Sequence, residues 1–456
     1  MGFGSCYNEE YMKRSIVVLG IILFLGFLIR LLALSQSLWL DEGVTARVVR
    51  EYGFLEIIPK FSLFDFHPPL YYFFMKFWTS LFGFSEVSLR MPSILFSLIT
   101  AYALYIIASK QGKEKYGLLA SLFFLFNPLI LYYSQEARMY MMAVMWVTLW
   151  FLAFQNNKEG SLLANLCAFF AISTFYGTTL FFIFLFFFQS KQIKRNSFMY
   201  GVIGALILHA PLLFFQLFNA RVVVSLVPHW STVLGTASFK NLYLIFIKFS
   251  SGRVSFEPKI IYLILSFIWG MFVWTVAVVG MKQSKHRMYG IAVIGTIVVA
   301  CIFSFFTPLL QYFRFLFLIP FLSLLLVFGS ERIKGARTVL VAGFVLWSFL
   351  YLFFPQFHRE DWKSLSVLVP QSGSVVGIVS SLDALRYYVP QASIIEARNF
   401  NCHMLSQKKL TLVPYTFEVY GILPEQVEKQ ISLCGYRKEQ EIQKRGVSGI
   451  IFSRLE

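Results

Sequence analysis

Two adjacent carboxylates, Asp41 and Glu42, follow closely on the first long apolar segment of the chain. Carboxylates at a membrane boundary are costly when they face lipid, so these two must lie in water, in a polar cavity or against a partner. In a partly desolvated pocket, a carboxylate can take a proton from an attacking hydroxyl group. Because neighbouring side chains on one backbone usually point apart, we predict a single general base, Asp41. The alternative is an acidic pair that merely ends a helix.

Glu42 is expected to face basic groups of the chain itself. If a helix begins at Gly43, the candidates are Arg47 and Arg50, which would lie about a turn away. Loss of Glu42 should then disturb the order of this loop first. We also count Glu42 among the residues expected to contact substrate.

A lone Asp-x-His pattern, Asp65 and His67, offers two metal ligands in the same stretch, and a distant His229 is a third. This spacing is weak support for a metal. We therefore assign no metal ligands and leave a divalent metal open as a cofactor.

A second polar cluster, Tyr132–Tyr140, lies between two apolar segments. Arg138, at a membrane interface beside aromatic residues, is suited to bind a phosphate ester through two N–H groups. The alternative is that Arg138 simply pairs with Glu136. Arg314, at the start of a later apolar segment, is another candidate for binding the phosphate. Alternatively, its side chain extends to the lipid headgroups without contacting substrate. Weaker candidates are Arg90 and Lys76.

The composition is that of a membrane protein. Of 456 residues, 57% are hydrophobic and 14% are charged, and the mean hydropathy is +0.67. The formal net charge of +17 does not indicate nucleic acid, because most Lys and Arg residues fall in short loops between apolar runs. The five cysteines show no metal-binding spacing.

About eleven apolar segments are long enough to be membrane helices. We expect the first, which resembles a signal peptide, to be an uncleaved anchor with its N-terminus inside. Residues 68–82, which begin with two prolines, suit an interfacial helix better than a crossing. The predicted spans are residues 15–34, 89–108, 116–133, 138–154, 162–175, 178–189, 198–218, 259–281, 289–306, 313–329 and 338–354.

With this topology, the dense basic loops fall on the cytoplasmic side, as the positive-inside rule requires. The unusual polar clusters and the C-terminal tail then share the opposite face. The loops are Lys110–Lys115, Lys158, Lys191–Arg195, Lys282–Arg287 and Arg332–Arg337.

The tail changes character, so we divide the chain into a membrane domain, residues 1–357, and an extracytoplasmic α/β domain, residues 358–456. In the tail, we predict strands at 374–380 and 410–413 and helices at 382–388 and 424–434. Cys402 and Cys434 can pair if the tail is extracytoplasmic. The default role of this domain is support or acceptor docking.

Four motifs occur in order: Leu40-Asp-Glu42, His67-Pro-Pro-Leu-Tyr-Tyr72, Ser88-Leu-Arg-Met-Pro92 and Ser134-Gln-Glu-Ala-Arg-Met-Tyr140. Together they resemble the family 39 type of membrane glycosyltransferases with the GT-C fold, which includes protein O-mannosyltransferases and the lipid A aminoarabinose transferase. The junction His358-Arg-Glu-Asp-Trp362 resembles the bacterial branch. The sequence departs from the eukaryotic enzymes, since Tyr-Tyr follows His-Pro-Pro-Leu and their large soluble insert is missing.

The resemblance implies an all-α polytopic protein of the GT-C type in the plasma (inner) membrane, with juxtamembrane helices in the first external loop. It implies a polyprenyl-phosphate sugar donor and inverting transfer, on the extracytoplasmic face, to a glycan, lipid or protein acceptor. It carries over Asp41 as catalytic base, Glu136 and Arg138 in the sugar-phosphate pocket, and His67 near the cavity. The expected substrate-binding residues are Glu42, His67, Glu136, Arg138, Tyr140 and Arg314.

Two other classes of function are weighed against an enzyme. A secondary transporter should bury charges within spans or show repeated halves, and neither pattern is present in the sequence. A non-catalytic lipid-binding scaffold would keep the arginines without needing the carboxylates. No P-loop or GxGxxG motif is present, which fits a lipid-linked rather than a nucleotide donor.

Overall fold

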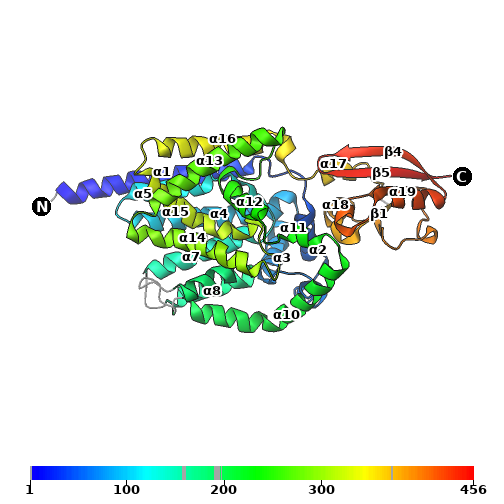
Figure 1. The fold of residues 1–456 in the computed structure, drawn as a ribbon, viewed down its shortest axis with the longest axis horizontal. Helices are drawn as coiled ribbons and strands as arrows, with labels where there is room; N and C mark the ends of the chain where they lie inside the picture. The colour runs from blue at the N-terminus through cyan, green and yellow to red at the C-terminus, as the bar shows by residue number, and fades with distance from the viewer. Residues whose placement is uncertain (1–2, 157–160, 189–195, 197, 371–372, 456) are drawn as a thin grey trace.

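The structure is a computed structural model that describes residues 3–156, 161–188, 196, 198–370 and 373–455. A body of long helices carries a small sheet domain at one end, and α1 projects from the other (Figure 1). The helices of the body are α1 (Phe3–Leu31), α4 (Glu86–Ser109), α5 (Glu114–Leu125), α6 (Pro128–Ser134), α7 (Tyr140–Asn156), α8 (Leu162–Thr174), α9 (Thr178–Phe187), α10 (Met199–Leu226), α13 (Lys259–Gly280), α14 (Ser284–Phe303), α15 (Ile319–Ser330) and α16 (Ala336–Phe353).

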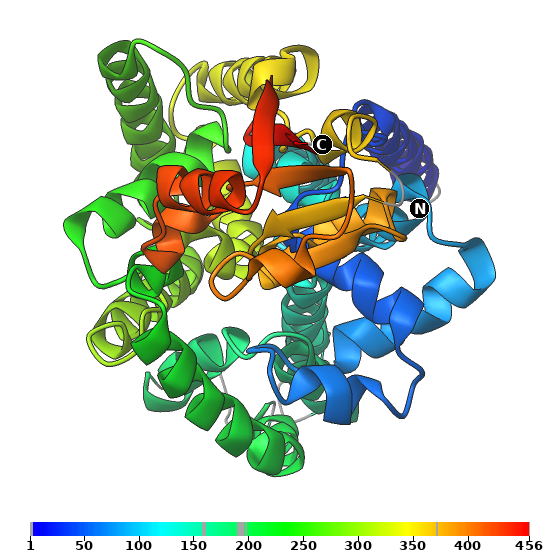
Figure 2. The ribbon, with the colours of Figure 1, turned by 90° about the vertical axis from the view of Figure 1, so that its right-hand side faces the viewer.

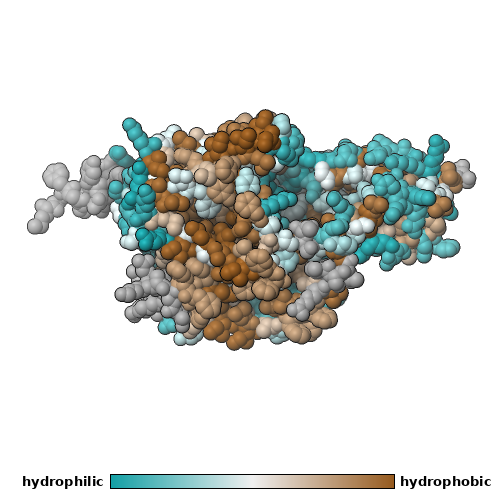
Figure 3. All heavy atoms as spheres, viewed as in Figure 1, coloured by the Kyte–Doolittle hydropathy of each residue, from teal (hydrophilic) through white to brown (hydrophobic). Residues whose placement is uncertain are grey.

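Each predicted span coincides with one or more helices, so the protein is a multi-pass membrane protein. Seven described helices are long and apolar enough to cross a bilayer, and α5 with α6, bent by 64°, forms an eighth if the pair is one span. The apolar helices α8 and α9 are shorter, and the total of eleven stays a prediction. Apolar side chains cover much of the body on the face in Figure 3, and hydrophilic ones cover most of the C-terminal domain.

Two of the predicted basic loops meet in the structure. Lys115 lies 2.9 Å from Glu331, so residues 110–115 and 332–337 belong to one end of the bundle. Lys158 and the segment Lys191–Arg195 were predicted to join them, and both lie outside the described residues.

The loop between α1 and α4, which was predicted to be the first external loop, folds into three short helices: α2 (Leu40–Glu51), the π-helix η1 (Ile57–Ser62) and α3 (Leu70–Phe82). With 13 residues, α3 is about 20 Å long, too short for a hydrocarbon core of about 30 Å. Tyr71, Tyr72 and Met75 are buried on one face of α3, whereas Phe77 and Leu81 are more than half exposed on the other. This amphipathic pattern supports the predicted interfacial helix.

A break between α5 and α6 places the polar cluster Tyr132–Tyr140 at the end of the bundle. The side chain of Asn127 accepts hydrogen bonds from the backbone N–H groups of Leu129 and Ile130, and Pro128 occupies the first turn. After α6, the Gln135 amide donates to the carbonyl oxygen of Arg30 at the end of α1. The loop 135–139 is therefore fixed beside the first external loop.

Short elements complete the body. They are α11 (Trp230–Leu234), α12 (Phe239–Ser251), the 3₁₀ helix η3 (Tyr312–Leu318) and η4 (Pro355–Phe357).

The C-terminal domain is a five-stranded mixed sheet of order β2-β1-β3-β5-β4. The strand β1 is parallel to β2 and β3, and β5 is antiparallel to β3 and β4. Seen from its own end, the domain lies over the middle of the helical body (Figure 2). Its elements are α17 (Trp362–Ser366), β1 (Ser374–Gly377), η5 (Val379–Ser381), α18 (Asp383–Tyr388), β2 (Ser393–Glu396), η6 (Cys402–Met404), β3 (Lys409–Val413), η7 (Phe417–Tyr420), α19 (Pro424–Leu433), β4 (Tyr436–Lys444) and β5 (Val447–Arg454).

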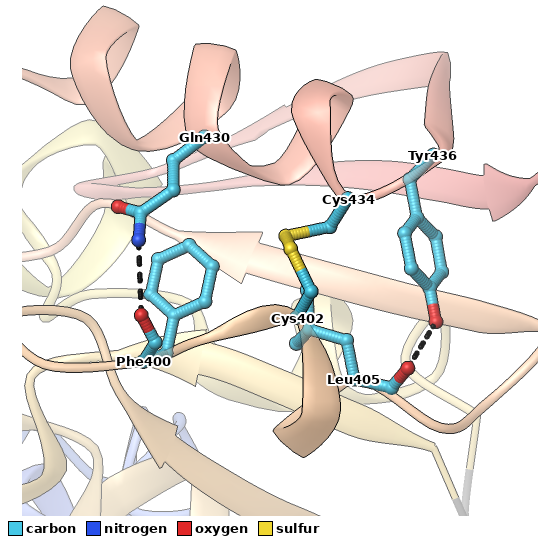
Figure 4. Close-up of a disulfide and its surroundings, with 6 residues drawn as sticks. All are labelled: Phe400, Cys402, Leu405, Gln430, Cys434 and Tyr436. Carbon is cyan, nitrogen blue, oxygen red and sulfur yellow. Dashed lines mark hydrogen bonds between the residues drawn. A yellow bond between two sulfur atoms is a disulfide. The ribbon is translucent and has the colours of Figure 1, made fainter.

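The elements predicted in the tail are confirmed as β1, β3, α18 and α19, and the pairing of Cys402 with Cys434, which the sequence left open, is present. Cys402 and Cys434 pair with their Cα atoms 5.1 Å apart, joining η6 to the end of α19 (Figure 4). Beside the disulfide, the Tyr436 hydroxyl donates to the carbonyl oxygen of Leu405 at 3.0 Å. These contacts fix the connection between β2 and β3 against α19.

Candidate active site

Asp41 lies in the first turn of α2, where the helix dipole favours an acidic side chain. Its side chain is 34% exposed, and its Oδ2 lies 3.8 Å from Nε of Arg138. A carboxylate that faces a buried cation and still reaches solvent can accept a proton from an incoming group.

Arg138 connects Asp41 to a chain of polar groups on the first external loop. Its Nη1 donates to the hydroxyl of Tyr72 at 3.1 Å, and that hydroxyl donates to Oδ2 of Asp65 at 3.0 Å. The Nδ1 of His67 lies 3.1 Å from Oδ1 of Asp65. Burial raises the pKa of Asp65, but His67 and its hydrogen bond outweigh this effect, so the pKa is below its usual value. His67 thus acts on Asp41 only through intermediate groups.

Within the described ranges, no three His, Cys, Asp or Glu side chains come together in an arrangement that would hold a metal ion. The structure joins His67 to Asp65 and adds no third ligand to this pair.

Glu42 is fully buried and saturated by donors of the chain itself. Arg90 donates from Nε to Oε1 at 2.8 Å and from Nη2 to Oε2 at 2.6 Å. The backbone N–H of Ala137 donates to Oε1 at 2.8 Å. Burial raises the pKa of Glu42, but Arg90 and Arg359 outweigh it, and the pKa is lowered. Glu42 therefore ties α2 to α4 and to the loop 135–139.

The prediction that Glu42 faces Arg47 or Arg50 is wrong. Because α2 begins at Leu40, Arg47 lies about 140° around the helix from Glu42 and pairs with Asp383 instead. Arg50 lies two turns away and is exposed.

The two weaker phosphate candidates hold backbone carbonyl groups. Besides Glu42, Arg90 binds the carbonyl oxygens of Leu34, Gln36 and Ser37. Lys76 donates to the carbonyl oxygen of Val49 at 2.8 Å. Both side chains thus fix the first external loop.

Glu136 is fully buried, and its partner is Arg359 rather than Arg138. Nη2 of Arg359 lies 3.3 Å from Oε2 of Glu136, and its guanidinium lies 4.4 Å from the ring centre of Tyr132. Burial raises the pKa of Glu136 to about 7, although Arg359 opposes the shift. The pairing of Glu136 with Arg138 that we weighed is absent from the described ion pairs. Sequence reasoning missed Arg359, although it stands inside the junction motif 358–362.

Tyr140 and Arg314 flank the same region. Tyr140 is buried at the start of α7, and its ring packs against the rings of Tyr133 and Phe313. Arg314, in η3, donates from Nη1 to the carbonyl oxygens of Leu234 and Pro308 at 3.1 and 3.0 Å. The guanidinium of Arg314 lies 6.0 Å from the ring centre of Phe313, whose ring contacts that of Tyr140.

A further arginine, Arg253, was missed by the sequence analysis. Its Nη1 donates to the hydroxyl of Tyr132 at 3.0 Å, and its guanidinium lies 5.5 Å from the ring centre of Trp39. The preceding Gly252 has φ +71°, and a Cβ there would lie 2.8 Å from Cβ of Pro128, so glycine is required. A Gly-Arg pair in a predicted external loop was the available signal.

These residues place excess positive charge at the end of the bundle that contacts the C-terminal domain. Arg138, Arg253 and Arg359 lie among tyrosines, beside the ionisable carboxyl groups of Asp41 and Glu136. Buried guanidinium groups next to a carboxyl group with a pKa near neutrality suit an anionic ligand.

Comparison with known proteins gives a family match over part of the chain and a fold match over nearly all of it. Residues 66–215 match the family model of the dolichyl-phosphate-mannose-protein mannosyltransferases. The matched range includes His67, Glu136, Arg138 and Tyr140 and stops before Arg314. No curated protein matches the chain by sequence.

Two crystal structures of ArnT from Cupriavidus metallidurans share the fold over nearly the whole chain. The structure in the apo state has a TM-score of 0.61 at 11% identity, covering 98% of this chain and 98% of that chain. The structure bound to undecaprenyl phosphate has a TM-score of 0.58 at 12% identity, covering 97% and 98%. Residues 66–215 therefore resemble those mannosyltransferases in sequence, and the whole chain has the fold of the ArnT structures.

Proposed function

We propose that the protein is an inverting glycosyltransferase that moves a monosaccharide from a polyprenyl-phosphate donor to a hydroxyl group. The acceptor is a glycan, lipid or protein of the cell envelope, and no nucleotide takes part. The observation that carries the proposal is the carboxylate of Asp41, partly exposed and 3.8 Å from the buried guanidinium of Arg138. The similarity to an ArnT structure bound to undecaprenyl phosphate supports the class of donor.

The reaction is a single displacement. The acceptor hydroxyl gives its proton to Asp41 while its oxygen forms a bond to the anomeric carbon of the donor sugar. The bond between this carbon and the phosphate oxygen breaks on the opposite face of the ring, and polyprenyl phosphate leaves with the electron pair. Because the attack comes from the opposite face, the anomeric configuration inverts.

Arg138 stabilises the negative charge that grows on the leaving phosphate. A guanidinium that is only 5% exposed acts in a medium of low dielectric constant, where a fixed positive charge has a large effect on developing charge. Arg314 is the second phosphate ligand of the proposal, since it lies against Phe313, whose ring contacts Tyr140 two residues after Arg138. Arg253 is a third candidate, because it lies in the same external region against Trp39.

The two other acidic residues take different roles. Glu42 was predicted to contact substrate, but its oxygens face Arg90 and Ala137, so we assign it to holding α2 in place. Glu136, with a pKa of about 7, keeps its predicted place in the sugar-phosphate pocket as a hydrogen-bonding group. His67 and Tyr140 stay assigned to the rim of the pocket.

We place the active site and residues 358–456 on the extracytoplasmic side. The disulfide Cys402–Cys434 supports this side, because disulfides persist in oxidising compartments. The basic loops at the other end of the bundle agree with a cytoplasmic location. A reporter fused after Phe357 that is active only in the cytoplasm would overturn this topology.

A transporter or a lipid-binding scaffold would share the membrane helices and the arginines. Neither of them needs a proton acceptor at Asp41. Asp41→Asn should therefore inactivate an enzyme but leave a transporter or a scaffold functional.

The proposal is tested by mass spectrometry of envelope glycans, lipids and proteins from a deletion strain. We expect loss of one sugar-bearing product, which the wild-type gene restores and the Asp41→Asn gene does not. Protein levels in the membrane should be equal for the two genes. Full restoration by Asp41→Asn would contradict the enzymatic role of this residue.

A further inference from the structure

The helix that carries Asp41 is in direct contact with the C-terminal domain. The helices α2 and α18 lie side by side, although about 340 residues separate them in sequence (Figure 1). They meet at Gly43, where a Cβ atom would lie 2.3 Å from the backbone nitrogen of Ala384 and 2.6 Å from the carbonyl carbon of Asp383. Backbone atoms cannot give way at such distances, so only glycine permits this approach.

A buried ion pair joins the same two helices one turn further along. Nε of Arg47 lies 2.9 Å from Oδ2 of Asp383, and the side chain of Asp383 is only 2% exposed. Arg386, in the next turn of α18, also faces Asp383, at 3.5 Å from Oδ1. Arg47 in turn donates to the hydroxyl of Tyr52 at the end of α2. Removing one partner of a buried pair leaves the other charge uncompensated.

The segment that leads into α2 is held by the same domain and by the junction before it. The backbone N–H of Leu38 donates to the hydroxyl of Tyr388 at 2.9 Å. The backbone N–H of Lys363 donates to Oγ of Ser37 at 3.1 Å. The backbone N–H of Arg359 donates to Oε1 of Gln36 at 3.1 Å. Contacts to the C-terminal part of the chain therefore run from Gln36 to Arg47 on both sides of Asp41.

The opposite face of α2 is fixed to the membrane body through Glu42 and Arg90. One face of α2 is therefore attached to the membrane body and the other to α18. Asp41 directly precedes Glu42 and Gly43, which make these two attachments. Its distance to Arg138 is thus set jointly by the membrane body and by the C-terminal domain.

We propose that the C-terminal domain positions the catalytic base, with Gly43, Arg47 and Asp383 as positioning residues that act through α2. This inference rests on the proposed function, because it gives Asp41 the role of base. A displacement of about 1 Å at a reacting group costs about a hundredfold in rate. Loosening α2 should therefore reduce transfer while the donor site, built largely from the membrane body, stays intact.

The test uses Gly43→Ala, which forces the helices apart, and Asp383→Asn, which removes only the charge. The controls are Gly53→Ala, where a Cβ meets only ordinary contact at 3.5 Å, and Glu439→Gln, which breaks an exposed ion pair with Lys409 in the same domain. Two quantities are measured for full-length protein. They are the envelope product that the deletion strain lacks, per folded protein, and the affinity of detergent-purified protein for undecaprenyl phosphate.

We expect both test variants to lose tenfold or more of the product rate while their affinity for undecaprenyl phosphate stays within about twofold. Arg47→Lys, which keeps the charge, should retain more activity than Arg47→Met. The control variants should behave as wild type. If Gly43→Ala does not accumulate, Asp383→Asn and the Arg47 pair decide the question.

Normal product rates in Asp383→Asn and Arg47→Met would overturn the positioning role. A lower unfolding temperature with an unchanged product rate per folded protein would overturn it as well, because that result describes a purely structural contact. Asp41→Asn, measured in parallel, separates the two proposals. If Asp41→Asn is inactive and the α2–α18 variants are normal, only the positioning role fails. If Asp41→Asn is fully active, Asp41 is not the base, and the part of the proposed function on which the positioning role rests fails.

Discussion

Two neighbouring carboxylates of α2 meet arginines in opposite ways. Glu42 and Arg90 are both fully buried, with an N–O distance of 2.6 Å, and backbone groups take up their remaining hydrogen-bonding capacity. Asp41 and Arg138 stand 3.8 Å apart, and Asp41 is one-third exposed. The first pair has no hydrogen-bonding group left for a ligand, whereas both partners of the second pair keep hydrogen-bonding capacity that a ligand can use.

Two consecutive residues thus have different roles: Glu42 holds helices together, and Asp41 is available to a substrate. A buried pair with every donor and acceptor satisfied holds elements together but has nothing left to offer a substrate. A loosely paired carboxylate can exchange protons, and a loosely paired guanidinium can bind an anion. Residue type does not distinguish the two; their surroundings do.

The largest expected effect is that of Asp41→Asn on turnover. Asn keeps the size and much of the hydrogen bonding of Asp but cannot accept a proton. We expect a loss of about a hundred- to ten-thousand-fold in turnover, with undecaprenyl phosphate binding unchanged. Purified protein, a polyprenyl-phosphate sugar and an identified acceptor provide the assay. Near-normal turnover in Asp41→Asn with an inactive Glu42→Gln would move the base to Glu42, and near-normal turnover in both variants would make Glu136 the carboxylate to test.

Glu42→Gln should act on the fold instead. It leaves the buried charge of Arg90 without its counter-ion, and breaking such a pair typically costs about 3–5 kcal/mol. We expect a lower yield and a lower unfolding temperature in detergent, with a milder loss of turnover per folded molecule than in Asp41→Asn. Wild-type thermal stability in Glu42→Gln would show that the closed pair does not hold α2.

Arg138→Ala and Arg314→Ala should weaken use of the donor by roughly a hundredfold, because each removes a guanidinium expected at the leaving phosphate. The rate at limiting donor concentration is the quantity to measure. Arg50→Ala removes an exposed arginine of α2 and is the matched control. Normal transfer at limiting donor by both test variants would refute the phosphate-binding role.

The smallest expected effect concerns Glu136 and pH. Its pKa in the folded protein is about 7, above the unfolded value of about 4.3, so the folded state holds this proton more tightly. The resulting stabilisation is fully present below the unfolded pKa and is lost as pH rises through about 7. We expect the unfolding temperature of the wild type to fall between pH 5 and pH 8 by this contribution, and Glu136→Gln to flatten the dependence. Parallel pH curves for the two proteins would contradict the shift.

Apolar length and periodicity were sufficient to predict the helical body, because a chain in lipid must satisfy its backbone within helices. The helix α3 and the strands β1 and β3 were predictable as well, because their apolar residues form recognisable patterns in the sequence. The strand β4 was missed because it lies at the edge of the sheet and reads Tyr-Arg-Lys-Glu-Gln-Glu-Ile-Gln-Lys, with most side chains exposed. An edge strand of this composition carries no hydrophobic alternation to detect.

By itself, the sequence determined that this is a polytopic membrane protein and that Asp41, Glu136 and Arg138 belong to one polar region. The order of the motifs and the alternation of loops carry that information. Only the tertiary structure decided which groups meet. Glu42 pairs with Arg90, Glu136 with Arg359, and Arg47 with Asp383. The reason is physical: these partners lie 48, 223 and 336 residues apart, and packing rather than local periodicity brings them within hydrogen-bonding distance.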